Sequence, residues 1–124
     1  MILLLDTHAL LWALASSRQL SATARAAILD LENEILVSAV SGWEIAIKKS
    51  LGRLQAPDDL VEAVEAAGFR KRPIELADTL RLQGLPNHHR DPFDRMLVAK
   101  ALVDDVSIVS RDPQLAPYPV RLVW

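Results

Sequence analysis

Five acidic side chains stand where an apolar run ends or where a helix is expected to begin. They are Asp6, Glu44, Asp91, Asp94 and Asp112. Asp6 directly follows an apolar run over residues 2–5. Asp91 and Asp94 bracket Pro92 at the start of an expected helix. In parallel α/β sheets, ligands bind outside the carboxyl ends of the strands, so all five acids can project toward the same edge.

Carboxylates gathered at one edge would suit a metal-dependent hydrolase. At a low effective dielectric constant they repel one another by an amount on the order of a few kcal/mol, which a divalent cation offsets. Hard oxygen ligands favour Mg²⁺ and Mn²⁺. Such a cation lowers the pKa of a bound water and stabilises charge on a phosphodiester during in-line displacement, and a second cation can share these tasks. The acids therefore predict a Mg²⁺ or Mn²⁺ site for phosphodiester hydrolysis.

Helix capping is an alternative explanation for two of these acids. Asp6 can be the N-cap of a helix that begins near Ala9, although an unpaired carboxylate beside so many apolar residues is costly. Glu44 lies in the first turn of its expected helix, and Ser41 three residues earlier completes the capping-box pattern S-x-x-E. Lys48, four residues on, is then a surface ion-pair partner. Local sequence alone favours capping for Glu44 and a functional role for Asp6.

The other three acids have local explanations that are compatible with a site. Asp91 before Pro92 is typical of an N-cap followed by proline at the first helical position. Asp94 then falls where a carboxylate interacts favourably with the helix dipole. Asp112 before Pro113 is typical of a turn. A helix N-terminus can position a carboxylate for a metal without losing its cap.

Neighbouring polar residues can support the acids. Thr7 and Ser110 can bind a metal-bound water or a phosphate, although capping and turn bonding explain them equally well. Arg95 and Arg111 flank candidate acids and can contact phosphate, with solvated surface arginines as the alternative. The candidates for substrate contact and specificity are Trp43, Lys48, Lys49, Arg53 and Arg95.

The histidines raise the alternative of a zinc site. His8, His88 and His89 are the three histidines of the chain, and they could join Asp91 around one ion. Adjacent histidines in a loop rarely both bind the same ion, so we favour oxygen ligands over zinc.

Short apolar runs alternate with helical patterns along the chain. The predicted strands are residues 2–5, 35–37, 72–74, 107–109 and 120–123, the last of them at an edge. The predicted helices are residues 9–15, 21–32 with Ser21 as N-cap, 41–51 ending at Gly52, 57–67 ending at Gly68, 74–85 and 92–103. This alternation predicts an α/β sandwich with a mainly parallel central sheet. The last helix is apolar nearly all round and must pack on that sheet.

Composition limits the remaining possibilities. At 124 residues the chain is long enough for one domain and too short for two, so we expect a single domain over residues 1–124. Without cysteine there is no disulfide or thiolate metal site, which fits a reducing compartment. Because Asp6 and His8 interrupt the N-terminal apolar stretch, we expect no membrane span and a cytoplasmic location. With a net charge of −2, nucleic-acid binding would need a local basic patch or metal ions.

Four segments carry these residues in a recognisable order and spacing. They are Leu3-Leu4-Leu5-Asp6-Thr7-His8, the segment Ser38-x-x-Ser41-x-Trp43-Glu44-Ile45, the stretch His89-Arg90-Asp91-Pro92-Phe93-Asp94-Arg95-Met96-Leu97-Val98-Ala99, and Val109-Ser110-Arg111-Asp112. Together they resemble the PIN-domain ribonucleases of the VapC toxin type. The resemblance spans the whole chain, and Asp-Pro-Phe-Asp-Arg is its most specific part.

The resemblance implies a PIN-like three-layer sandwich and a metal-dependent endoribonuclease that is the toxin of a type II toxin–antitoxin system. It implies that Asp6, Glu44 and Asp94 hold Mg²⁺ or Mn²⁺. It gives Asp112 the role of a fourth, more variable acid and Asp91 a positioning role. Ser110 keeps the hydroxyl that usually precedes the last acidic segment. The implied partners are an RNA substrate, a second copy in a homodimer, and a cognate antitoxin inserted near the active site, with a hetero-oligomer as a further possibility.

Two alternatives stand beside this interpretation. A catalytically inactive PIN-type RNA-binding or scaffold protein should have lost at least one acid, and none is missing. A Mg²⁺-dependent receiver or phosphatase-like α/β domain also places an acid after its first strand. However, a haloacid-dehalogenase phosphatase resembles Asp-x-Asp-x-Thr there, and this chain has His8 at the second Asp position. A receiver would have an acidic pair where only Asp6 stands.

Overall fold

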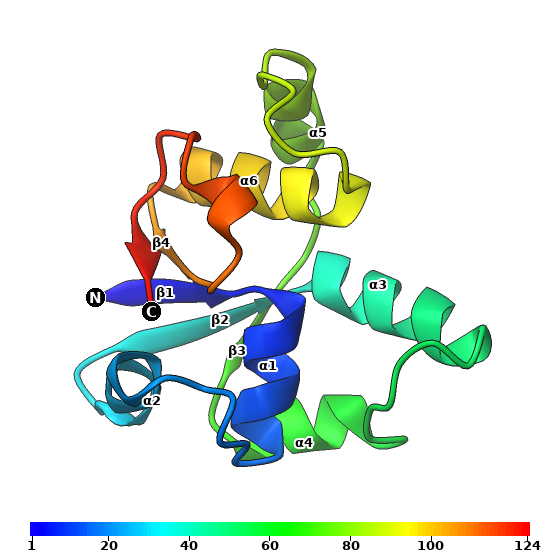
Figure 1. Cartoon of the computed structure of the whole chain (residues 1–124), viewed down its shortest axis with the longest axis vertical. Coiled ribbons are helices and arrows are strands. Elements are labelled where there is room, and N and C mark those ends of the chain that lie inside the picture. The colour runs from blue at the N-terminus through cyan, green and yellow to red at the C-terminus, as the bar shows by residue number, and fades with distance from the viewer.

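The computed structural model describes residues 1–124 and has a five-stranded sheet at its centre (Figure 1). The strands are β1 (Ile2–Leu5), β2 (Glu34–Ser38), β3 (Arg70–Arg72), β4 (Ser107–Val109) and β5 (Leu122–Val123). Their order is β3-β2-β1-β4-β5, and every neighbouring pair is parallel. The predicted parallel sheet is confirmed, with the first strand of the chain at its centre.

The central strand β1 is fully enclosed. Leu3, Leu4 and Leu5 are buried, because β1 has a neighbouring strand on each side and helices on each face. Continuous apolar runs are typical of such strands. The register pairs Leu5 with Val109 of β4, and the Asp6 N–H donates to the Val109 carbonyl at 3.1 Å. The residues that follow β1 and β4 therefore leave the sheet at the same edge.

Helices cover both faces of the sheet, which gives three layers (Figure 1). They are α1 (Thr7–Leu14), α2 (Ala22–Leu29), α3 (Ala39–Ser50), α4 (Leu60–Ala66), α5 (Leu76–Gln83) and α6 (Pro92–Asp104), with a 3-10 turn η1 (Pro113–Leu115). Leu3 and Leu5 face the core shared with α1, α2 and α4, whereas Leu4 faces the core shared with α5 and α6. This arrangement confirms the predicted three-layer α/β sandwich. None of the helices combines the length and apolar character needed to cross a membrane.

The two edge strands differ from their predicted positions, whereas β2 is only one residue longer at each end than predicted. β3 covers residues 70–72 rather than 72–74, because Pro73 has no N–H for the ladder and ends the pairing with β2. β5 begins at Leu122 rather than at residue 120, because the Val120 N–H donates to the Tyr118 carbonyl in a turn. Both are edge strands with a single neighbouring strand, so a local turn competes with only one set of ladder hydrogen bonds.

The helices lie within three residues of their predicted bounds. Ser21 caps α2 as predicted, its Oγ accepting the Ala24 N–H at 3.0 Å. Gly52 and Gly68 follow α3 and α4 with φ values of 68° and 77°. Glycine adopts this left-handed conformation without the steric penalty of a side chain. Both predicted glycine stops are therefore confirmed.

Helix α3 begins two residues earlier than predicted, and this changes the setting of Glu44. Its N-cap is Ser38, whose Oγ accepts the Val40 N–H at 3.0 Å. Glu44 consequently lies in the second turn rather than the first. The capping box expected between Ser41 and Glu44 is wrong, and the buried Glu44 carboxylate serves no helix end.

Helix α6 packs on the sheet as predicted and carries a buried cation. Lys100 is 4% exposed, and its Nζ lies 3.3 Å from Asp78 Oδ2 of α5 and 3.4 Å from Asp104 Oδ2. Buried charges are tolerated chiefly when they are paired. Asp78 Oδ2 also accepts the Glu75 N–H at 2.8 Å at the start of α5. This ion pair therefore attaches α5 to α6.

We predict that Lys100→Met lowers the free energy of unfolding by about 3 kcal/mol, because it leaves the buried Asp78 carboxylate without its cation. Urea denaturation at pH 7 measures the effect. The same substitution in an Asp78→Asn background should cost far less, because the amide carries no charge to compensate. An equal cost in both backgrounds would show that Lys100 contributes through packing or through Asp104 rather than through its pairing with Asp78.

Candidate metal centre

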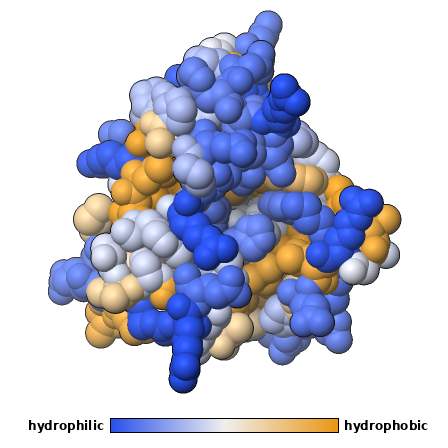
Figure 2. Space-filling model, in the orientation of Figure 1, coloured by the Kyte–Doolittle hydropathy of each residue, from blue (hydrophilic) through white to orange (hydrophobic).

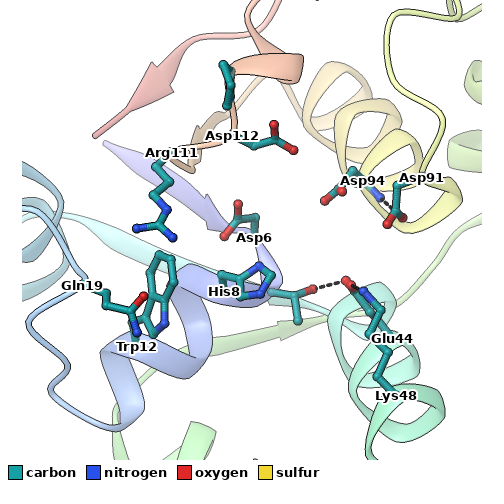
Figure 3. A pocket seen from close by; sticks show the side chains of 12 residues that line it. Asp6, His8, Trp12, Gln19, Glu44, Lys48, Asp91, Asp94, Arg111 and Asp112 are labelled. Carbon is teal, nitrogen blue, oxygen red and sulfur yellow. Dashed lines mark hydrogen bonds and ion pairs between the residues drawn. The ribbon is translucent and has the colours of Figure 1, made fainter. Parts of the chain in front are cut away.

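The structure brings the five predicted acids together in one cavity of about 620 Å³ (Figure 3). The cavity opens beyond the carboxyl end of β1, among residues of α1, α3 and α6. Its lining residues are Asp6, Thr7, His8, Trp12, Gln19, Glu44, Lys48, Asp91, Asp94, Arg111, Asp112 and Pro113. The expectation that these acids project toward the same edge of the sheet agrees with this placement.

Asp6 follows β1 directly, and its side chain is 7% exposed. It is the N-cap of α1, with Oδ1 accepting the Ala9 N–H at 2.8 Å. The capping explanation is therefore correct, yet the same side chain lines the cavity. Burial raises the pKa of Asp6, and hydrogen bonds from Ser110 and Ala9 oppose that rise. The neighbouring charge of Asp112 adds to it.

Glu44 reaches the cavity from α3 and is 3% exposed. Thr7 Oγ1 of α1 donates to Glu44 Oε1 at 2.5 Å, and Lys48 Nζ donates to Oε2 at 2.5 Å. The hydrogen bond with Glu44 raises the pKa of Lys48. Thr7, one of the predicted supporting residues, therefore holds Glu44 across two helices. The predicted ion pair with Lys48 exists, but it stands in the cavity wall rather than on open surface.

Asp91 and Asp94 enter the cavity from the start of α6 (Figure 3). Asp91 is the predicted N-cap before Pro92, and its Oδ1 accepts the N–H of Phe93 at 2.8 Å and of Asp94 at 3.3 Å. Burial and then the charge of Asp91 raise the pKa of Asp94 to about 7, although His89 opposes the rise. Glu44 and Asp6 add smaller contributions in the same direction. The raised pKa of Asp94 thus reflects a poorly solvated carboxyl group with other carboxylates beside it, a combination that is common at functional sites.

Asp112 follows β4 and lies across the cavity from α3 (Figure 3). Its Oδ1 accepts the Gln114 N–H at 2.9 Å, which makes it the N-cap of η1 and confirms the predicted turn. Its Oδ2 lies 2.8 Å from Nε2 of His89. Ser110 Oγ accepts the Asp112 N–H at 3.0 Å and is itself buried. Ser110 therefore supports the acids from beneath and does not line the cavity.

The two predicted arginines have different settings. Arg111 lines the cavity, with its guanidinium carbon 4.4 Å from the centroid of the Trp12 ring. Arg95 points away from the cavity, and its guanidinium donates to the Pro86 carbonyl at 2.8 Å and to the Tyr118 hydroxyl at 3.2 Å. Arg95 thus holds the loop before α6, which corrects the predicted contact with phosphate. Arg111 keeps its place as a phosphate-binding candidate.

Among the other residues predicted for substrate contact, Lys48 alone lines the cavity. Trp43 is 50% exposed and packs edge-on against Phe93, with 4.8 Å between the ring centroids. Lys49 is instead paired at 2.5 Å with an exposed carboxylate of the loop after α3. Arg53 is exposed in the turn that follows α3. Of these residues, Lys48 therefore borders the acids directly, and Trp43 contacts the first turn of α6 through Phe93.

From the sequence, His89 is considered only as a ligand in the zinc alternative, and its contact with the carboxylates of Asp94 and Asp112 is not predicted. This residue is 8% exposed, and its Nε2 lies 2.8 Å from Asp112 Oδ2 and 3.2 Å from Asp94 Oδ2. It stands two residues before the N-cap Asp91. From that position a side chain can fold back over the start of the helix. The spacing between His89 and the N-cap is therefore the feature of the sequence that could have predicted its contact with the acids.

The three histidines do not form the zinc site that was considered as an alternative. His8 packs against Trp12 with ring centroids 5.4 Å apart, and His88 packs edge-on against Tyr118 at 5.0 Å. His89 is the one histidine whose ligand atom lies among the carboxylates. The preference for oxygen ligands over a histidine-rich zinc site agrees with this geometry.

The donor set of the cavity fits a hard divalent cation. The predicted ligands are Asp6, Glu44, Asp94 and Asp112. Ligand atoms of Asp94 and Asp112 lie within 4.8 Å of each other. Burial is the main cause of the raised pKa values of Asp6 and Asp94, and neighbouring carboxylates add to both, so a nearby cation would favour the ionised forms. Mg²⁺ or Mn²⁺ would supply this positive charge through the oxygen ligands that both ions prefer.

An all-parallel α/β sandwich with acids gathered beyond its central strand is the class of protein that this geometry defines. The sequence profile of the PIN domain matches residues 3–119. The chain belongs to the PIN domain family. A search of curated protein sequences gives no significant match.

Solved structures share the fold at low sequence identity. The chain is similar to one in the VapBC2 complex from Rickettsia felis bound to a DNA fragment from its promoter, with a TM-score of 0.68 and 13% identity over 98% of this chain and 97% of that chain. It is also similar to a chain of a toxin–antitoxin complex from Klebsiella pneumoniae, with a TM-score of 0.64 and 19% identity over 94% and 92% of the two chains. At these identities the likeness concerns the fold.

We predict that Asp94 makes the metal-free protein less stable as the pH rises from 3.8 to about 7, the values of its pKa in the unfolded and folded states. Between them the unfolded state has lost a proton that the folded state keeps, so rising pH favours unfolding. Above about 7 the penalty is complete. Asp94→Asn should therefore raise the free energy of unfolding at pH 8 by about 1–3 kcal/mol, a range reduced for partial exposure.

Urea unfolding in EDTA at pH 3.5 and pH 8 tests this, with Glu32→Gln as an exposed control outside the cavity. The gain from Asp94→Asn should nearly vanish at pH 3.5. An equal gain at both pH values would contradict the electrostatic explanation.

Proposed function

We propose that this protein is a metal-dependent endoribonuclease and the toxin component of a type II toxin–antitoxin system. The observation that carries the nuclease proposal is the meeting of Asp6, Glu44 and Asp94 in one cavity of a PIN fold. Asp112 completes the acidic set on the opposite wall. Because all four acids are present, an inactive RNA-binding or scaffold protein is the weaker candidate. The match to the PIN domain family also argues against a receiver or phosphatase-like domain.

The chain's own residues hold the acids in place for the reaction. One oxygen of Asp6 accepts the Ala9 N–H, which orients that carboxylate at the end of β1. Thr7 and Lys48 orient the two oxygens of Glu44. When bound by Asp6, Glu44 and Asp94, Mg²⁺ or Mn²⁺ supplies an activated water and stabilises charge on the phosphodiester. Asp112 borders this set, and Asp91 positions the start of α6 by capping it.

The two ends of the cavity could bind the RNA strand on either side of the cleaved phosphate. Arg111 lies over Trp12 at one end, and Lys48 lies at the other, with the acids between them (Figure 3). Cationic groups placed in this way can contact flanking phosphates. The half-exposed Trp43 beside Phe93 offers a face on which an unpaired base can stack. We therefore propose single-stranded or loop RNA as the substrate class.

The proposed partners are a cognate antitoxin and a second copy of the chain. Two structural neighbours come from toxin–antitoxin complexes, which supports an antitoxin partner. Figure 2 shows apolar side chains on the face that carries α3 and α4, where Ile47, Leu51 and Val61 are 38%, 59% and 53% exposed. An antitoxin seated on this surface would reach the cavity along α3, because Lys48, which lines the cavity, follows the exposed Ile47 directly in that helix. The homodimer and the cytoplasmic location rest on the sequence predictions.

We predict that the purified protein cleaves RNA with Mg²⁺ or Mn²⁺ and loses cleavage in EDTA. Asp6→Asn and Asp94→Asn should each lower kcat by about 100-fold or more, because each removes a carboxylate ligand. Cleavage of a fluorescent single-stranded RNA measures activity, and circular dichroism verifies the fold. Glu32→Gln is the matched control, an exposed acid-to-amide change away from the cavity. Full activity in EDTA would exclude the metal mechanism.

We predict that expression of the protein arrests bacterial growth and that Asp6→Asn abolishes the arrest. Co-expression of a small protein encoded next to its gene should restore growth, because an antitoxin blocks the cavity. Colony counts after induction measure both effects. An active nuclease that leaves growth unaffected would refute the toxin role while leaving the enzymatic proposal intact.

A further inference from the structure

The ring of His89 is held in one orientation by the backbone beside it. Its Nδ1 accepts the Asp91 N–H at 3.0 Å. A nitrogen that accepts a hydrogen bond carries no proton, so the neutral ring carries its proton on Nε2. The hydrogen-bond pattern therefore assigns the tautomer.

The protonated nitrogen points at two of the cavity's acids. Nε2 lies 2.8 Å from Asp112 Oδ2 and 3.2 Å from Asp94 Oδ2. These carboxylates come from different parts of the fold, Asp94 from α6 and Asp112 from the turn after β4. The ligand oxygens of the two carboxylates lie within 4.8 Å of each other, and two like charges so close repel each other unless a donor stands between them. The Nε2–H of His89 is such a donor.

The imidazole is poorly suited to be a ligand itself. Binding a cation through Nε2 would need a lone pair there, and the neutral ring would then carry its proton on Nδ1. That proton would face the N–H of Asp91, which Nδ1 now accepts. Two donors would oppose each other in a buried place, and this is costly. The grouping of His89, Asp94 and Asp112 is thus better explained as two carboxylates joined by a donor than as three ligands.

His89 is also held from behind. The backbone N–H of His89 donates to the Tyr118 hydroxyl at 2.9 Å, and that hydroxyl donates to the Pro86 carbonyl at 2.8 Å. Arg95 donates to both the hydroxyl and the same carbonyl. Tyr118 is 3% exposed, so this network is enclosed. The loop therefore presents the ring to the acids in a preset position.

We propose that His89 is a positioning residue that joins Asp94 to Asp112 through its Nε2–H and so shapes the site for a divalent cation without binding it. The importance of this contact for RNA cleavage rests on the proposed function. Donors next to metal ligands typically change metal affinity or activity by about 10–100-fold when they are removed. The contact itself can be tested without RNA.

Two substitutions separate the two nitrogens of the ring. In His89→Gln the amide nitrogen falls near the place of Nε2 and can still donate to Asp112. In His89→Asn the carbonyl oxygen falls near the place of Nδ1, so it can accept the Asp91 N–H but leaves the acids without a donor. A role limited to holding the loop would be rescued by Asn, whereas the positioning role is rescued by Gln.

Titration calorimetry of the full chain with Mn²⁺ alone measures the difference. We expect His89→Gln to bind Mn²⁺ within about threefold of the wild type and His89→Asn to bind it about 10–100-fold more weakly. The RNA cleavage rate of His89→Asn should recover at high Mn²⁺, with the KM for RNA unchanged. Equal Mn²⁺ affinity of His89→Asn and wild type would overturn the proposal.

Nitrogen NMR of the wild-type imidazole gives a readout that needs no variant to fold. We expect a protonated Nε2 and an unprotonated Nδ1 in the metal-free protein, and the same pattern after addition of Mg²⁺. A proton on Nδ1, or loss of the Nε2 proton on Mg²⁺ binding, would show that His89 is a ligand. The NMR pattern of the wild type and the Mn²⁺ affinities of the two variants could both be as expected while the wild type cleaves no RNA. In that case the proposed function fails and the role of His89 stands.

Discussion

Negative charge concentrated beyond the carboxyl end of β1 is held in place by backbone N–H groups at the starts of helices. Asp6, Asp91 and Asp112 are the N-caps of α1, α6 and η1, and one oxygen of each accepts a main-chain N–H at 2.8–2.9 Å. The N-terminus of a helix carries a partial positive charge that favours a carboxylate. Capping therefore both orients these acids and reduces the electrostatic penalty of bringing them together.

The remaining two acids depend on side chains instead. Glu44 has the Thr7 hydroxyl and the Lys48 ammonium, whereas Asp94 has the ring of His89 at 3.2 Å. Burial, followed by the charge of Asp91, raises the pKa of Asp94 to about 7, and His89 only partly opposes that rise. The site thus opposes folding in the absence of a cation, as functional sites commonly do. Burial of the leucines of β1, which directly precede Asp6, offsets that penalty.

Capping and a place in the cavity, which the local sequence presents as competing explanations, are combined in Asp6, Asp91 and Asp112. A carboxylate has two oxygens, so the oxygen that caps a helix leaves the other for the cavity. Glu44 is the exception, because Ser38 takes the cap of α3 and pushes Glu44 into the second turn. A four-residue pattern such as S-x-x-E could not reveal this, since Ser38 and Ser41, three residues apart, are both possible N-caps of the same helix.

The sequence by itself determined the parallel sandwich, the ends of β1 and β4, the cap at Asp91 and the identity of the five acids, because apolar periodicity and capping act over a few residues. For Asp6 it offered capping only as the alternative to a functional role. The tertiary structure decided which partners those acids meet. His89 reaches Asp112 across 23 positions of sequence, Arg95 turns to the loop before α6, and Arg111 settles on Trp12. The contact of Arg111 with Trp12 exists because the parallel register sets β4 beside β1, a pairing between distant segments that no local pattern encodes.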